Sequence, residues 1–237
     1  TRVLAGPWCT QLLADYGAEV LKVESPKGGD DARKIPPFFT DESAYAGEQK
    51  QPISAFFACC NRGKSSVIVD IRTAEGQAQI REMVAEADIF VENFKVGNLS
   101  KYGLDYASLS AINPRLIYCA VSGFGQVGPE RATAAFDGMI QAMSGLMSIT
   151  GLPGQGPVRA GIPVADLTAG LYTAIGILVA LLEREVSGLG QWLHTSLLQS
   201  MVYMMDFQTA RWLVDGEVPQ QAGNYHPTSI PTGVYKA

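Results

Sequence analysis

A single carboxylate stands near the start of a strongly apolar stretch, GIPVADLTAGLYTAIGILVALLERE at residues 161–185. Asp166 is its only acidic residue before Glu183. Aspartate often caps a helix by accepting hydrogen bonds from the free backbone N–H groups of the first turn. A carboxylate at the mouth of an apolar pocket can instead be catalytic. The stretch by itself leaves both roles open.

A glycine-rich segment, GFGQVG at residues 123–128, matches the GxGxxG pattern of dinucleotide-binding proteins. That fingerprint requires a helix directly after the glycines, in the first strand–helix unit of the fold. Here Pro129 follows, and no helix is expected before about residue 135. The segment suits a loop that lets a ligand approach the backbone better than it suits a nucleotide fingerprint.

Three other stretches contain residue types that bind ligands, each with a plainer alternative. Glu24, at the end of an expected strand, could bind a ribose hydroxyl or be a solvated strand end. NRGKSS at residues 61–66 lacks the Walker pattern, and could offer a cation to phosphate or be a surface turn. In VENF, Asn93 could hydrogen-bond to a ligand and Phe94 could stack on one.

The elements that must position these residues alternate between strands and helices over residues 1–123. We expect strands over 18–24, 65–71, 88–94 and 115–123, an irregular region over 30–58, and helices over 6–17, 73–87 and part of 99–112. This alternation predicts an α/β fold, with a parallel sheet covered by helices on both faces. Ligands of such sheets bind beyond the carboxyl ends of the strands. Further helices are expected over 134–149, 167–186 and 194–214.

Composition restricts the class of protein. The chain has 237 residues, of which 47% are hydrophobic, with a net charge of −5, so nothing indicates a nucleic-acid-binding protein. The four cysteines have no CxxC spacing, and with two histidines they predict no metal site. The apolar stretch 171–182 is shorter than the ~20 residues that span a bilayer, so we expect a buried helix and no membrane association.

The two ends of the sequence fall inside expected elements. The chain begins at Thr1 within a strand-to-helix turn and ends within a strand, so we expect part of a longer protein. We predict a large domain over residues 1–215, followed by a linker and the start of a smaller second domain over 216–237.

An ordered set of motifs resembles one family, the family III CoA-transferases (CaiB/BaiF family). The motifs, in chain order, are LAGPWCTQLLADYGAEVLKVE, NRGKSSVIVDI, AEGQ, DIFVENF, INPRLIY, SGFGQVGP, FDGMIQAMSGLMSITG, PVADLTAGLYTAIGILVALLERE and GNYHP. The resemblance implies a Rossmann-like large domain, a smaller second domain and an interlocked homodimer. It implies an enzyme that moves CoA between an acyl-CoA and a small carboxylic acid, with no cofactor beyond CoA as substrate. The four cysteines, taken as reduced thiols, predict a cytoplasmic location.

The resemblance also implies site residues. Asp166, in VADLTAG, falls at the position of the nucleophile. The positions of CoA contacts fall on Val3, Leu4, Val69, Asp70, Ile71, Arg72, Asn93, Phe94, Lys95, Lys101, Ala134, Ala135, Phe136 and Asp137.

Several positions depart from the family pattern. Ser25 stands where relatives often have arginine, and Ala134 stands where the formyl-CoA transferase branch has a cation. The family's glycine-rich loop over the acyl intermediate would lie beyond residue 237. Two alternatives remain: an acyl-CoA racemase of the same family, which would need a histidine at Phe136, and a CoA-binding protein without catalysis.

Overall fold

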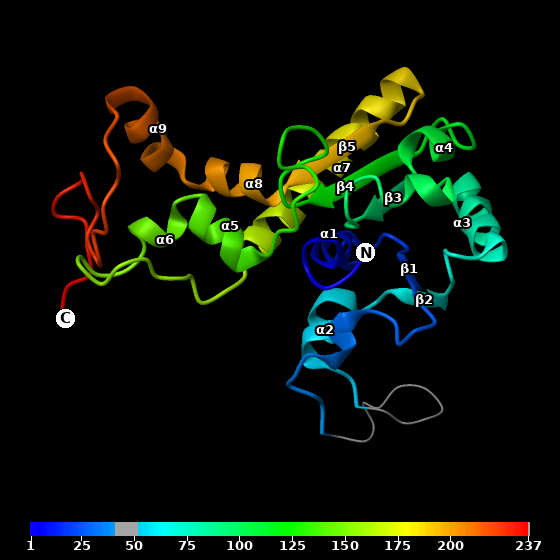
Figure 1. Ribbon diagram of the computed structural model, residues 1–237, viewed down its shortest axis with the longest axis horizontal. Helices are drawn as coiled ribbons and strands as arrows, with labels where there is room; N and C mark the ends of the chain where they lie inside the picture. Colours follow the sequence, from blue (N-terminus) through cyan, green and yellow to red (C-terminus); the bar gives the residue numbers. More distant parts are fainter. Residues whose placement is uncertain (41–51, 237) are drawn as a thin grey trace. The chain divides into compact units, whose positions relative to one another are not determined.

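The computed structural model describes residues 1–40 and 52–236, and Figure 1 shows the order of its elements. The chain forms two compact units. The first contains Thr1–Ser122 and Gly170–Thr195, and the second contains Gly123–Ala169 and Ser196–Ala237. This division does not test the predicted domain boundary at residue 216, which stays a prediction.

Strands and helices alternate in the first unit, as predicted. Its elements are α1 (Ala5–Asp15), β1 (Leu21–Glu24), η1 (Asp31–Lys34), α2 (Ala55–Asn61), β2 (Ser65–Ile68), α3 (Ala74–Glu86), β3 (Ile89–Glu92), η3 (Ser100–Tyr102), α4 (Tyr106–Ser110), β4 (Ile117–Ser122), most of α7 (Val164–Ser187) and β5 (Trp192–Ser196).

The strands form two hydrogen-bonded sheets, whereas we had expected one. β1 pairs with β2 in parallel, Leu21 opposite Ser65, and β3 pairs with β4 in parallel, Ile89 opposite Ile117. β5 extends the second sheet, in the order β3-β4-β5. The expectation of parallel strands is therefore confirmed, and that of one continuous sheet is wrong.

Strand β4 has a core on each face because successive side chains of a strand point to opposite sides. Tyr118 and Ala120 pack in one cluster with Ile80 and Val84 of α3 and Leu109 of α4. Ile117 and Cys119 pack in another cluster with Cys9 of α1 and with Ala174, Ile177 and Ala180 of α7. Helices thus cover both faces of this sheet, as the alternating pattern predicted.

The prediction of an irregular region over 30–58 is partly wrong. Residues 41–51 of this region lie outside the described residues. The region contains η1 and the start of α2. Ser54 caps α2, since its hydroxyl accepts a hydrogen bond from the Phe57 amide at 3.2 Å. This cap residue is the sequence signal for the helix, although Pro36, Pro37 and Pro52 nearby favour irregular structure.

Two of the expected helices, over 134–149 and 194–214, have wrong bounds. The predicted helix over 134–149 begins only at Asp137 and divides into α5 (Asp137–Met143) and α6 (Leu146–Ile149) around Gly145, whose φ is 90°. The predicted helix over 194–214 is β5, α8 (Leu197–Met204) and α9 (Asp206–Asp215). Ser196 ends the strand and caps α8 through the Gln199 amide at 3.1 Å.

Helix α7 is longer than the apolar stretch that predicted it. It has 24 residues, and its most apolar window has a mean hydropathy of 1.8, so by length and composition it could cross a membrane. A core helix of a soluble protein passes the same test, and Ala174, Ile177 and Ala180 of α7 are buried in the core. An apolar stripe of α7 is exposed, formed by Leu171, Ile175, Leu178, Val179, Leu182 and Val186.

Candidate active site

A cavity of about 600 Å³ in the first unit follows the carboxyl ends of β1, β2 and β3. Its lining includes Glu24 at the end of β1 and Ser25 after it, residues 69–72 after β2, and Glu92 at the end of β3. Both β1 and β3 line it, so it lies where the sheet is interrupted. This is the end of a parallel α/β fold at which ligands bind.

Five of the predicted CoA-contact residues line this cavity: Val69, Asp70, Ile71, Arg72 and Phe94. The Arg72 guanidinium makes two hydrogen bonds to Asp70, at 2.7 and 2.5 Å. Both side chains are partly exposed, so this cation is accessible beside the cavity.

The cavity is not lined by the other predicted contacts of the first unit, which are Val3, Leu4, Asn93, Lys95 and Lys101. Asn93 is bonded to the backbone of Arg2, which does line the cavity: its Oδ1 accepts from Arg2 N–H and its Nδ2 donates to Arg2 O, both at 2.8 Å. Asn93 therefore supports the wall, and its binding of a ligand stays a prediction, as do the roles of Lys95 and Lys101.

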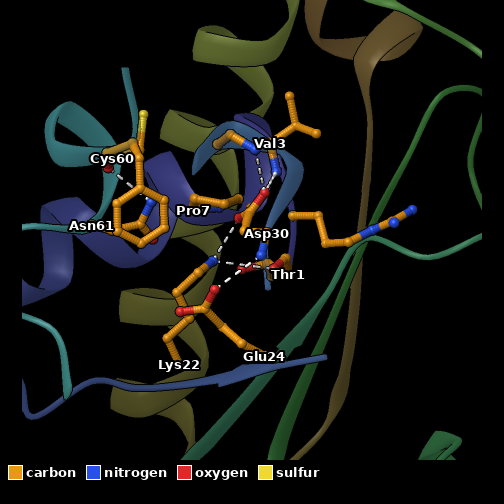
Figure 2. A network of polar contacts seen from close by, with 12 residues as sticks. Thr1, Val3, Pro7, Lys22, Glu24, Asp30, Cys60 and Asn61 are labelled. Carbon is orange, nitrogen blue, oxygen red and sulfur yellow. Dashed lines mark hydrogen bonds and ion pairs between the residues drawn. The ribbon is translucent and has the colours of Figure 1, made fainter. Parts of the chain in front are cut away.

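Figure 2 shows a buried ion pair between Lys22 and Asp30, both of which line the cavity. Lys22 Nζ lies 2.8 Å from Asp30 Oδ2, and the two side chains are 4% and 1% exposed. Asp30 Oδ1 accepts hydrogen bonds from the amides of Val3 at 2.9 Å and Ala32 at 3.0 Å. Val3 has a φ of 64°, a strained value for a β-branched residue, so Asp30 holds the backbone where CoA contacts were predicted.

Glu24 is neither a solvated strand end nor free to bind a ribose. It is buried, and its carboxylate accepts hydrogen bonds from Arg33 at 2.8 and 2.5 Å, Ser66 at 2.7 Å and the Asp30 amide at 2.9 Å. Burial alone would raise its pKa, but these hydrogen bonds outweigh burial and lower the pKa to about 2. Glu24 is therefore a permanently ionised structural group in the cavity wall.

Lys64, in NRGKSS, is not on a surface turn. Its ammonium donates to Pro7 O at 2.8 Å, Thr10 Oγ1 at 2.8 Å and Cys60 O at 2.6 Å, so it joins α1 to the end of α2. Burial, with a contribution from Lys22, lowers its pKa to about 7. Its hydrogen bonds to the protein make it a structural cation rather than a phosphate ligand, although it also lines the cavity.

The second unit contains Asp166, inside the first turn of α7. The helix begins at Val164, so Asp166 is two residues beyond the start, and the interpretation as an N-cap is wrong. Among residues 1–40 and 52–236, no hydrogen bond or ion pair to its carboxylate is recorded. Burial, with the like charge of Asp137, raises its pKa to about 6.

The predicted CoA contacts Ala134, Ala135, Phe136 and Asp137 immediately precede or begin α5. Phe136 is 75% exposed, whereas Asp137 is buried. Asp137 Oδ1 accepts from the Ala165 amide at 2.9 Å, and Oδ2 accepts from Gln141 at 2.7 Å and Arg159 at 3.2 Å. The structure thus joins Asp137 to the turn that carries Asp166, and contact of these four residues with CoA stays a prediction.

The glycine-rich segment 123–128 serves packing rather than a nucleotide. A Cβ on Gly123 would lie 2.2 Å from the Ala135 side chain, so this position needs glycine. Turns and loop follow the segment until α5 begins at Asp137. The nucleotide fingerprint is therefore absent at this segment.

Sequence reasoning missed several cavity residues. Lys22, Lys27, Asp30 and Glu92 line the cavity, although no role was predicted for any of them. Burial raises the pKa of Glu92 to about 7, and its Oε2 accepts from the Phe94 amide at 2.7 Å. Only its place at the end of an expected strand could have indicated Glu92. In residues 1–40 and 52–236, no group of three His, Cys, Asp or Glu could hold a metal ion.

Comparison with known proteins identifies the family. Residues 1–237 match the model of CoA-transferase family III. The chain belongs to this family. It is 46% identical over 230 residues to a succinate–glutarate CoA-transferase of Agrobacterium fabrum, covering 97% of this chain and 56% of that protein. It is 41% identical over 243 residues to a succinyl-CoA:mesaconate CoA-transferase of Haloarcula hispanica, covering 100% of this chain and 59% of that protein.

A solved family III structure has the same fold. The crystal structure of a CaiB/BaiF family protein from Brucella suis superposes with a TM-score of 0.90 at 46% identity, over 98% of this chain and 59% of that one. The chain therefore spans a little over half the length of these relatives.

Proposed function

We propose that the protein transfers CoA from an acyl-CoA to a small dicarboxylic acid, with Asp166 as the nucleophile. The observation that carries the proposal is the state of Asp166: partly buried, without a recorded hydrogen bond, and with a pKa raised to about 6. A desolvated carboxylate of raised basicity attacks a thioester more readily than a solvated one. The acid class follows from relatives named for succinate, glutarate and mesaconate.

The proposed reaction is balanced without an additional reactant. Asp166 attacks the thioester carbonyl of the donor, which forms a mixed anhydride and releases CoA thiolate. The thiolate attacks the aspartyl carbonyl, which leaves an aspartyl-CoA thioester and the free donor acid. The acceptor carboxylate attacks that thioester, which releases CoA thiolate and forms a second anhydride. The thiolate then attacks the acceptor carbonyl of this anhydride, which forms the new acyl-CoA and regenerates the Asp166 carboxylate.

The apolar character of α7 supports this chemistry. Thr168 and Ala169, two and three residues after Asp166 in the helix, are buried. Burial around Asp166 excludes water, and this exclusion protects an anhydride from hydrolysis. The N-terminal turn of a helix also favours an anionic side chain. Burial outweighs this dipole effect at Asp166, because the net result is a raised pKa.

An acyl-exchange assay on the full-length protein tests the proposal. Succinyl-CoA is incubated with succinate, glutarate, mesaconate and monocarboxylic controls, and new acyl-CoA species are identified by mass spectrometry. Deuterium incorporation into a 2-methylacyl-CoA would indicate the racemase instead, and CoA binding without exchange would indicate a binding protein. Phe136 cannot transfer a proton, so we expect no deuterium incorporation.

The pH dependence of exchange should have an acid limb near pH 6. Asp166 attacks only when ionised, so kcat/KM is expected to fall about tenfold for each pH unit below 6, because it follows the ionised fraction of the free enzyme. Initial rates between pH 4.5 and 8, with stability checked at each pH, measure this limb. A rate that stays constant down to pH 4.5 would contradict the assigned nucleophile.

We further propose that the cavity of the first unit binds CoA, with Arg72 contacting a phosphate. Arg72→Ala is expected to weaken CoA binding about tenfold, because the variant loses a charge-assisted hydrogen bond to the phosphate. Arg62→Ala is a matched control: Arg62 also pairs with an aspartate at 2.5 Å and is 57% exposed, but is outside the recorded lining. Equal affinities of the two variants, measured by calorimetry, would exclude the phosphate contact.

The predicted homodimer and cytoplasmic location remain proposals. The exposed apolar stripe of α7 supports a homodimer, since a surface of this kind is typical of an interface. Sedimentation of the full-length protein as a monomer at micromolar concentration would contradict it.

A further inference from the structure

The start of α7 lacks a cap from its own sequence. The residue before the helix is Pro163, whose side chain has no acceptor, although its carbonyl accepts the first helical hydrogen bond from Leu167 at 3.1 Å. The first N–H groups of a helix have no partner within the helix and need one from elsewhere. The Ala165 amide finds it in Asp137 Oδ1, at 2.9 Å.

Side chains on one face of α5 hydrogen-bond to the backbone of residues 160–165, the segment that leads into the first turn of α7. Asp137 and Gln141 are four residues apart, so their side chains lie on the same face of α5. Gln141 Oε1 accepts from the Ala160 amide at 3.0 Å, and its Nε2 donates to Ile162 O at 3.2 Å and to Asp137 at 2.7 Å. The Gln141 side chain is fully buried and Asp137 nearly so, which makes these bonds costly to lose.

We infer that Asp137 is a positioning residue: it caps α7 from the neighbouring helix and so fixes the turn that carries Asp166. The inference rests on the proposed function of Asp166. Both Asp137 oxygens accept hydrogen bonds from the protein, so this side chain acts through the backbone of residue 165 and through charge. Its ionised form also acts on Asp166 directly, as the like charge that contributes to the raised pKa.

Two substitutions separate the cap from the charge. Asp137→Asn keeps an oxygen for the Ala165 amide but turns an NH₂ group toward Gln141 and Arg159, and removes the negative charge. Asp137→Ala removes the cap as well. We expect kcat for exchange to fall about a hundredfold in Asp137→Ala, because a displacement of about 1 Å at a reacting group costs about that factor. We expect a smaller fall, about tenfold, in Asp137→Asn, because this variant keeps the cap.

The inference requires that KM and the affinity for CoA stay within about threefold of wild type in both variants. The acid limb of kcat/KM is expected to move below pH 6 in Asp137→Asn, because the like charge is gone. A residue that served only stability would change neither kcat nor the position of this limb in the folded enzyme.

Asp105→Ala is the matched control. Asp105 caps α4 in the first unit, accepting from the Ser108 amide at 3.0 Å, and is remote in sequence from the proposed chemistry. It should lower stability with no change in kcat. A normal kcat and acid limb in folded Asp137→Asn would overturn the inference, and so would a large loss of CoA affinity, which would make Asp137 a direct CoA contact.

A second readout does not depend on transferase activity. The carboxyl pKa of Asp166, measured by carbon NMR on aspartate-labelled protein, should fall in Asp137→Asn, and the Ala165 amide should exchange at least tenfold faster in Asp137→Ala. If wild type transferred no CoA, the proposed function would fail while these two measurements still decided the role of Asp137. An unchanged Asp166 pKa together with unchanged amide exchange would overturn the inference.

Discussion

Replacement of Asp166 by asparagine is expected to abolish CoA exchange and, at neutral pH, to stabilise the fold. Asparagine has nearly the same shape but cannot form the anhydride, so exchange should fall by several orders of magnitude while CoA still binds. Hydroxylamine added during turnover should trap the wild-type acyl intermediate as a hydroxamate at residue 166, and should trap nothing in the variant. Asp166→Glu should also lose most of its activity, because its carboxylate is displaced by about 1 Å.

The gain in stability follows from the pKa of Asp166. The pKa is raised from 3.8 to about 6 on folding, so the folded state binds the proton more tightly than the unfolded state does. Wild type therefore loses stability as the pH rises from about 4 through 6, by at most about 3 kcal/mol. The variant has no such group, so it should be more stable than wild type at pH 8, and the difference should disappear near pH 3.5.

Urea unfolding at the two pH values measures this difference. Asp206→Asn is a matched control, because Asp206 also lies in the first turn of a helix of the second unit but is exposed. It should change neither exchange nor the free energy of unfolding by much. An Asp166→Asn variant that binds CoA and retains near-normal exchange would contradict the assignment of the nucleophile.

The sequence predicted those features that depend on local patterns. Alternating apolar strands and helical periodicity were enough for the parallel α/β arrangement, and the Thr73 cap correctly marked the start of α3. β5 was mistaken for helix because His194 and Thr195 precede a strongly helical, Met-rich segment with no proline or glycine between them. The strand forms there because Trp192–Ser196 pairs beside β4, a long-range contact that no local pattern reveals.

The contacts that join the candidate site residues could not be predicted from the sequence, and their roles stay predictions. Asp166 is an isolated carboxylate beside an apolar helix, and this pattern indicates either a helix cap or a catalytic group. The residue that caps the start of α7 is instead Asp137, which accepts a hydrogen bond from the Ala165 amide. These two residues are 29 positions apart, and nothing in the sequence joins them. Similarly, the sequence did not predict the burial of Lys22, Asp30 and Glu24, because burial of a charge depends on partners that only the folded chain brings together.

Removal of one partner of the buried Lys22–Asp30 pair is expected to have the largest effect on stability in the first unit. Lys22→Met leaves Asp30 ionised, 2% exposed and without its cation, and should cost about 3–5 kcal/mol. Because Asp30 also holds the Val3 amide, the variant should bind CoA weakly even where it is folded. Urea unfolding and calorimetry measure the two effects.

The arrangement of the pair predicts that a second substitution restores much of the loss. The amides of Val3 and Ala32 both donate to Asp30 Oδ1, whereas Lys22 donates to Oδ2. Asparagine at position 30 can keep the first oxygen and carry no charge, so Lys22→Met/Asp30→Asn should be more stable than Lys22→Met alone by at least about 1 kcal/mol. The exposed pair Arg62–Asp15 provides the comparison, since Arg62→Ala should cost less than about 1 kcal/mol. A Lys22→Met variant as stable as Arg62→Ala, or a double variant less stable than Lys22→Met, would show that the buried charges do not control this part of the fold.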